Sequence, residues 1–240
     1  MKFLLFILIN IFAAFFQGIV GFGQALIASP LSLTILSKGT VLTALVLAGL
    51  VLNATLAKKS KGPLDTQIFM PLLIGSVVGM PFGVILLKLL PLRVLTIEVG
   101  ALSILFALSI LFVKIKVQHI RKIAPIVGLV CGVLQTSTGM PGPIALLLFS
   151  GSNLSKDATR KILFSFFFWS GIISVPLFLV SRVLTTEGII LGLCCVPFVM
   201  LGGHYGHKVA DLVPRRWYRI IGLVTVCATG VFAIYTGIGR

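Results

Sequence analysis

The sequence has few charged residues and very few acidic ones. Only 5 of its 240 residues are Asp or Glu, against 20 Lys and Arg, and charged residues make up 10% of the chain. Soluble domains carry about 25% charged residues. A chain that is 58% hydrophobic could not bury all of its apolar side chains inside a water-soluble globule. The composition therefore excludes a soluble enzyme.

Reactive side chains in chemical patterns are also scarce. The four cysteines, Cys131, Cys194, Cys195 and Cys227, lie inside apolar stretches without metal-ligand spacing. Buried thiols behave as small hydrophobic side chains, so we expect neither a metal site nor a cofactor. No Ser/His/Asp, His/Glu or Cys pair has a spacing suited to catalysis, which disfavours a membrane enzyme. The sequence has no Gly-x-x-x-x-Gly-Lys-Ser/Thr motif for ATP binding, so direct ATP drive is disfavoured too.

Long apolar segments are abundant, and the mean hydropathy is +1.16. Because a helix of roughly 20 residues crosses a hydrocarbon core of ~30 Å, the pattern predicts an all-α polytopic membrane protein. Single crossings are predicted at 40–57, 67–87, 94–113, 160–181, 188–207 and 217–238. The segments 3–36 and 123–150 are too long or too interrupted for one crossing and carry Gly and Pro near their middle. Each is therefore predicted to form a broken helical hairpin.

The two hairpin segments resemble each other. Gln17-Gly-Ile-Val-Gly21-Phe-Gly23-Gln24-Ala aligns with Gln135-Thr-Ser-Thr-Gly139-Met-Pro141-Gly142-Pro, which pairs Gln17 with Gln135 and Gly21 with Gly139. A second pair of motifs follows in the same order, Gly79-Met-Pro-Phe-Gly83 with Pro91 and Arg93, and Gly202-Gly-His-Tyr-Gly206 with Pro214 and Arg216. Two matches in one order indicate an internal repeat. The predicted halves are 1–115 and 123–240, joined by a basic cytoplasmic linker at 116–122.

Counting Lys and Arg on each side tests this topology. If every long segment crossed once, the 20 basic residues would divide ten to ten, but two hairpins that return to their own side divide them fourteen to six. The larger group is Lys58, Lys59, Lys61, Lys114, Lys116, Arg121, Lys122, Lys156, Arg160, Lys161, Lys208, Arg215, Arg216 and Arg219. Because cytoplasmic loops carry the basic excess, the hairpin topology is favoured, with both termini outside. Each half then has a hairpin and three crossings, which makes the halves inverted repeats of the kind found in secondary transporters.

The glycine-rich breaks are the candidate binding site. An interrupted membrane helix leaves backbone groups unpaired, which is tolerated only inside protein or around a wet cavity. The N-terminus of a half-helix favours an anion, and glycine lets the ligand approach the backbone closely. Close helix packing is the alternative explanation of the same glycines. The predicted substrate-binding residues are Gln17, Gly21, Gly23, Gln24, Gln135, Ser137, Thr138, Gly139 and Gly142.

These motifs resemble those of the TauE/SafE family of membrane permeases, also called the sulfite exporter family. The resemblance covers nearly the whole chain and includes both breaks, both later Gly-x-x-x-Gly helices and the stretch Lys156-Asp-Ala-Thr-Arg160. Gln24, Pro141 and Pro143 interrupt the run of glycines that the family usually has. The resemblance implies a transporter that moves a small anion, such as a sulfur-containing oxyanion or an organosulfonate, across the bacterial inner membrane.

Other polar residues of the apolar segments are candidates for the transport pathway: Asn53, Trp169, Ser170, His204 and Tyr205. A packed or interfacial role is the alternative for His204. The expected partners are a small anion and the lipid bilayer, and nucleic acid is disfavoured because the basic residues are scattered between apolar segments. Coupling to protons, for which Glu98 is a candidate, or to another ion stays open, as does a homo-oligomer. The alternative function is that of a membrane assembly or scaffold component without transport activity.

Overall fold

The structure is a computed structural model that describes residues 1–91, 93–94, 96–98, 100–101, 104–105, 117–149, 154–212 and 214–238. Its helices are α1 (Lys2–Val20), α2 (Gln24–Ser32), α3 (Lys38–Lys59), α4 (Thr66–Leu89), α6 (Val117–Ser137), α7 (Gly142–Leu148), α8 (Lys156–Val180), α9 (Thr186–Leu212) and α10 (Arg215–Ile238). Within the described residues there is no strand, and six helices, α1, α3, α4, α6, α8 and α9, are long and apolar enough to cross a membrane. The predicted all-α membrane fold is confirmed.

The segments predicted as crossings are helical wherever the structure describes them. Segments 40–57, 67–87, 160–181, 188–207 and 217–238 match α3, α4, α8, α9 and α10. The segment 94–113 lies mostly outside the described residues. Helix α6 begins at Val117, so most of the predicted linker 116–122 is the first part of that helix.

Both predicted hairpins are broken where the glycines stand. Helix α1 ends because Gly21 adopts a left-handed conformation, with φ 90°, and its N–H donates to the Gln17 carbonyl at 2.8 Å. Gly23 precedes α2 with φ 120°, and Gly139 follows α6 with φ 77°. Side chains disfavour these conformations, whereas glycine adopts them readily. Each hairpin therefore turns at the point that its glycines allow.

The second arm of each hairpin is short. Helix α2 has 9 residues and α7 has 7, which at 1.5 Å per residue gives lengths of about 14 and 10 Å. Neither helix could cross a hydrocarbon core of ~30 Å. Each hairpin thus combines one long helix with a short return helix that ends inside the bundle.

The helix directions follow from pairs of close contacts. An added Cβ at Gly188 would touch Thr43, and one at Gly203 would touch Leu52, so α3 and α9 run parallel. Gly202 lies against the Ile11 carbonyl, and Gly206 lies against that of Phe15, four residues further along, so α1 also runs parallel to α9.

The other three of the six candidate membrane helices run the opposite way. Helix α4 returns along α3 after a short loop, and at its far end the Lys38 ammonium donates to the Leu87 carbonyl at 2.9 Å. Gly75 lies against Pro125 and Gly83 against Val133, so α6 is parallel to α4. Helix α8 is antiparallel to α3, since Lys161 near its start donates to the Ala57 carbonyl at 2.6 Å, and Phe178 near its end packs in one cluster with Val46.

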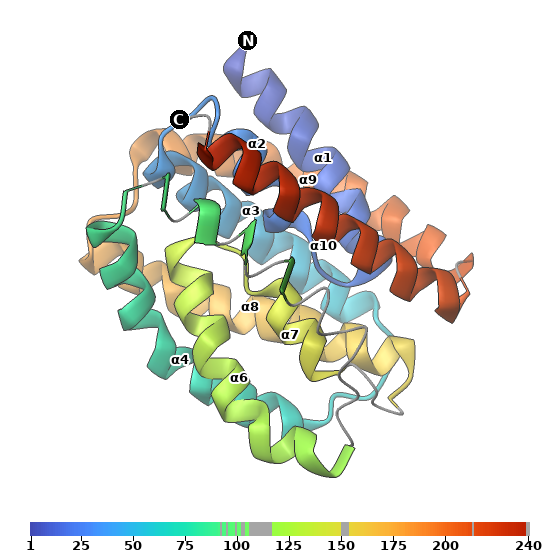
Figure 1. Cartoon of the computed structure of the whole chain (residues 1–240). Coiled ribbons are helices and arrows are strands. Elements are labelled where there is room, and N and C mark those ends of the chain that lie inside the picture. Colours follow the sequence, from blue (N-terminus) through green and yellow to red (C-terminus); the bar gives the residue numbers. More distant parts are fainter. Residues whose placement is uncertain are drawn as a thin grey trace.

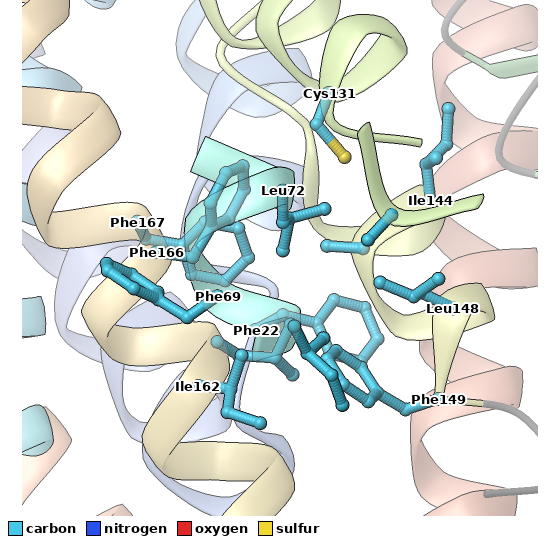
Figure 2. Close-up of a cluster of buried hydrophobic side chains, with 14 of the residues drawn as sticks. Phe22, Phe69, Leu72, Cys131, Ile144, Leu148, Phe149, Ile162, Phe166 and Phe167 are labelled. Carbon is cyan, nitrogen blue, oxygen red and sulfur yellow. The ribbon is translucent and has the colours of Figure 1, made fainter. Parts of the chain in front are cut away.

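These directions organise the molecule as Figure 1 shows it. Helices α4 and α6 lie side by side at one edge, α1 and α9 lie together at the other, and α3 and α8 lie between them. A buried cluster fills the space around the hairpins. Figure 2 shows Phe22 from the first break among side chains of α4, α7 and α8, including Phe69, Leu148 and Phe166. The first break is therefore packed against the second hairpin.

Candidate binding site between the two breaks

A cavity lies between the two glycine breaks. Its volume is about 60 Å³ when only the space open to the centres of water-sized molecules is counted. One water needs about 10–15 Å³ on this measure, so the cavity has room for roughly four to six waters or a small anion. Its lining comes from α1, the start of α2, α3, the second break and α8: Gln17, Gly23, Gln24, Ala25, Leu26, Leu42, Leu45, Val46, Gly49, Leu50, Asn53, Gln135, Gly139, Met140, Pro141, Gly142, Phe167 and Gly171.

Many of the predicted site residues meet at this cavity. Six predicted substrate-binding residues line it, namely Gln17, Gly23, Gln24, Gln135, Gly139 and Gly142, and so does the pathway candidate Asn53. They come from positions 17 to 142 of the sequence. Folding thus brings both predicted breaks to one pocket.

Hydrogen bonds link the amide side chains around the cavity. The Gln17 Nε2 donates to Asn53 Oδ1 at 2.6 Å, and the backbone N–H of Gln24 donates to Gln17 Oε1 at 2.9 Å. Asn53 Nδ2 donates to the Gly49 carbonyl at 2.8 Å. The first hairpin is thereby tied to α3 through side chains that are nearly fully buried.

Several donors at the cavity have no protein acceptor. The first N–H groups of a helix lack an intrahelical partner, and for Ala25 and Leu26 the described residues supply no acceptor. Gln135 is 8% exposed, lines the cavity, and makes no hydrogen bond within the described part of the chain. Among the described residues, the lining contains no Lys, Arg, His, Asp or Glu. The site therefore offers uncharged N–H donors.

Three predicted binding residues lie beside the cavity rather than in its lining. Gly21 caps α1, Ser137 is buried at the end of α6, and Thr138 follows it. The Thr138 carbonyl accepts a hydrogen bond from Ser29 Oγ at 3.3 Å, which joins the second break to α2. These residues shape and connect the breaks.

Four predicted pathway residues do not reach the cavity lining. Trp169 is 47% exposed and Tyr205 is 58% exposed on the outer faces of α8 and α9. Ser170 is buried, and its hydroxyl donates to the Phe167 carbonyl at 3.3 Å. The His204 ring pairs with the Lys59 ammonium near the end of α3. Glu98, the candidate for proton coupling, is exposed.

Sequence reasoning missed Asn10. Its side chain is fully buried in α1, where Nδ2 donates to the Phe6 carbonyl at 2.9 Å and Oδ1 accepts from Gln24 Nε2 at 3.4 Å. Asn10 is the only polar residue in the apolar run 3–16. Polar residues inside membrane helices usually face other protein groups. A lone Asn in an apolar run was therefore the sequence signal that could have identified this residue.

Sequence reasoning also missed the buried contacts of Arg160. Its guanidinium is fully buried and donates to the Gly18 carbonyl at 2.6 Å, with His207 Nδ1 also at 2.6 Å and Asp157 at 3.9 Å. It therefore connects α8 with α1 and α9. Within the described residues no group of three or more His, Cys, Asp or Glu could hold a metal ion.

Comparison with known proteins identifies the family. The family model described as Sulfite exporter TauE/SafE matches residues 6–233, nearly the whole chain. The chain belongs to the TauE/SafE family. This is a family of membrane transporters, which agrees with the apolar helices of a multi-pass membrane protein. No curated protein and no solved structure matches the chain.

Proposed function

We propose that this TauE/SafE protein is a secondary transporter that moves a small anion through the cavity between the two breaks. The observation that carries the proposal is the lining, in which glycines, amide side chains and the N-terminus of α2 meet without an ionisable side chain among the described residues. N–H donors and the positive end of a helix dipole favour an anion. Binding by dipoles would retain the anion without a full counter-charge and so permit its release.

The proposed substrate is a sulfur-containing oxyanion or an organosulfonate, and the proposed location is the bacterial inner membrane with both termini outside. The family description supports a sulfur anion. The volume of the cavity supports a small substrate. The fourteen-to-six division of basic residues supports the orientation.

We further propose that the halves are inverted repeats that rock against each other during alternating access. Supporting this, α1, α3 and α9 run one way, while α4, α6 and α8 run the other, so each of α1, α3 and α4 opposes its second-half counterpart. Equivalent residues of the two proposed repeats also make equivalent contacts with the other repeat. An added Cβ at Gly79 would lie 2.0 Å from the Leu129 carbonyl oxygen, and one at Gly202 would lie 2.4 Å from that of Ile11. Leu129 and Ile11 differ by 118 positions, as do Gln135 and Gln17.

Flux measurements on the purified chain in proteoliposomes would test this function. The panel would hold sulfite, thiosulfate, sulfonates and small carboxylates, each with and without a pH gradient. We expect saturable flux of at least one sulfur anion, and its loss when a bulky side chain enters the cavity in Gln135→Phe or Gly139→Leu. Tyr205→Phe, outside the cavity, serves as the control and should retain flux.

Two outcomes would contradict the proposal. Normal flux in Gln135→Phe and Gly139→Leu would show that the anion does not use this cavity. Absence of flux for the whole panel, together with copurification of a fixed membrane partner, would favour the assembly or scaffold function. Comparison of flux with and without the pH gradient shows whether transport is coupled to protons.

A further inference from the structure

We propose that the buried amides of Asn10, Gln24, Gln17 and Asn53, joined at Gln24 through its backbone N–H, form one hydrogen-bonded chain of fixed polarity that keeps N–H donors facing the cavity. In this chain Asn10 and Asn53 are positioning residues for Gln24 and Gln17. The inference rests on the proposed function, because it explains how a site without charged side chains would be biased toward an anion.

Backbone groups determine the orientation of two of the amides. The backbone N–H of Gln24 can only donate, so the Gln17 amide must present Oε1 to it. The Gln17 Nε2 then faces Asn53, which must accept through Oδ1. The Nδ2 of Asn53 is left to donate to the Gly49 carbonyl, which can only accept. The Gln24 N–H at one end and the Gly49 carbonyl at the other require the same orientations. Neither the Gln17 amide nor the Asn53 amide can therefore be reversed without loss of hydrogen bonds.

The same reasoning applies to Asn10. The Phe6 carbonyl can only accept, so Asn10 directs Nδ2 to it and presents Oδ1 to Gln24. Gln24 must therefore donate through Nε2, which lies 3.4 Å from Asn10 Oδ1. Its Oε1 is then directed toward Gly49, where an added Cβ would lie 3.5 Å from that oxygen. Asn10 does not line the cavity, so it acts on the site only through Gln24.

The consequence is an excess of donors. Protein donors occupy the amide oxygens of Asn10, Gln17 and Asn53. A primary amide has two N–H groups, and Gln17, Gln24 and Asn53 each use one. Each of these three residues lines the cavity and keeps a second N–H for which the described chain provides no acceptor. Among these three residues, three amide N–H groups therefore stand against one free amide oxygen, Gln24 Oε1, and the amide of Gln135 adds two N–H groups and one oxygen to the cavity.

A mutant cycle tests whether the four amides act as one unit. Asn10→Leu and Asn53→Leu would be made singly and together, and KM and Vmax for the transported anion measured in proteoliposomes. We expect each single change to raise KM about tenfold, with Vmax within about twofold, since the loss of one hydrogen bond to the network is worth up to about a factor of ten. Because both changes disable the same chain, the double variant should raise KM by much less than the hundredfold product.

Thr55→Val supplies the matched control on α3. Its hydroxyl donates only to the Val51 carbonyl at 2.8 Å, and it does not line the cavity. In the double variant with Asn10→Leu and Thr55→Val, the fold-change in KM should equal the product of the fold-changes in the two single variants. A full hundredfold product in the double Asn variant, unchanged KM in the single variants, or a loss confined to Vmax would each overturn the inference.

A stability measurement tests the inference independently of transport. Thermal unfolding of the same purified variants should show that Asn10→Leu and Asn53→Leu each lower Tm, and that together they lower it by less than the sum. Additive shifts, or no shifts, would contradict the chain even if flux is normal. Coupled shifts in a protein that moves no anion would instead leave the chain standing and contradict the proposed function. Should Asn10→Leu fail to insert, Asn10→Ser replaces it in both measurements.

Discussion

Two glycines at the cavity have different physical roles. Gly23 holds φ 120°, where its added Cβ would meet only Phe16 at an ordinary 3.6 Å, so backbone conformation alone requires glycine there. Gly49 lies inside α3, and its added Cβ would stand 3.5 Å from Gln24 Oε1. Gly49 thus provides space beside the amides, whereas Gly23 permits the turn that starts α2.

Gly23→Ala should destabilise the protein by about 1–3 kcal/mol, because an L side chain is strained at this φ. The measurement is thermal unfolding of the purified variant. Gly49→Ala is the matched control, since the same methyl group fits there and alanine favours a helix by about 1 kcal/mol over glycine. Equal losses of stability in both variants would contradict a conformational role for Gly23.

At the scale of helices, rows of glycine join α4 to α6 and α1 to α9. An added Cβ at Gly83 would lie 2.1 Å from the Val133 carbonyl oxygen, and one at Gly206 would lie 2.0 Å from that of Phe15. Both obstacles are backbone atoms of the facing helix. Small residues allow such close approach between membrane helices, which supplies packing that lipid cannot.

Gly83→Ala and Gly206→Ala should each lower stability by about 1–3 kcal/mol, because the facing helices must move apart. Thermal unfolding measures the loss, and Gly49→Ala again provides a control within a helix. Since the two contacts are equivalent in the proposed repeats, the two losses should be similar. A loss at only one of the two sites would argue against equivalent packing.

Arg160 joins three helices through one buried side chain. Replacing it in Arg160→Met keeps much of the apolar stem but leaves the Gly18 carbonyl without this donor. We expect a loss of about 1–3 kcal/mol, the cost of a buried group deprived of its partner. Lys88→Met, on an exposed side chain, is the control. An Arg160→Met variant as stable as the control would contradict the structural role.

Across the whole molecule, the basic residues that make contacts divide between the two ends of the helix bundle. Lys59, Arg121, Lys156 and Lys161 make contacts at one end of the bundle, whereas Lys38 bonds the far end of α4. In the proposed orientation the first end faces the cytoplasm, because cytoplasmic loops carry the basic excess.

Cysteine labelling in intact cells would check that orientation. In a background without the four native cysteines, Lys88→Cys should react with a membrane-impermeant thiol reagent added outside. Lys61→Cys should react only after the membrane is permeabilised. The side chains of both residues are exposed, so burial does not limit either reaction. The reverse pattern would place the termini in the cytoplasm.

The sequence alone determined the class of the protein, the membrane segments and the two breaks. Hydropathy, charge and glycine are properties of the chain itself, and a segment such as 40–57 is long and apolar enough to cross a membrane. The same information could not select the residues of the cavity. A membrane helix is apolar on nearly all sides, so its sequence does not show which face meets protein. Asn10 joins the amide chain while His204 pairs with Lys59 away from the cavity, and only the rotation and packing of α1, α3 and α9 decided that difference.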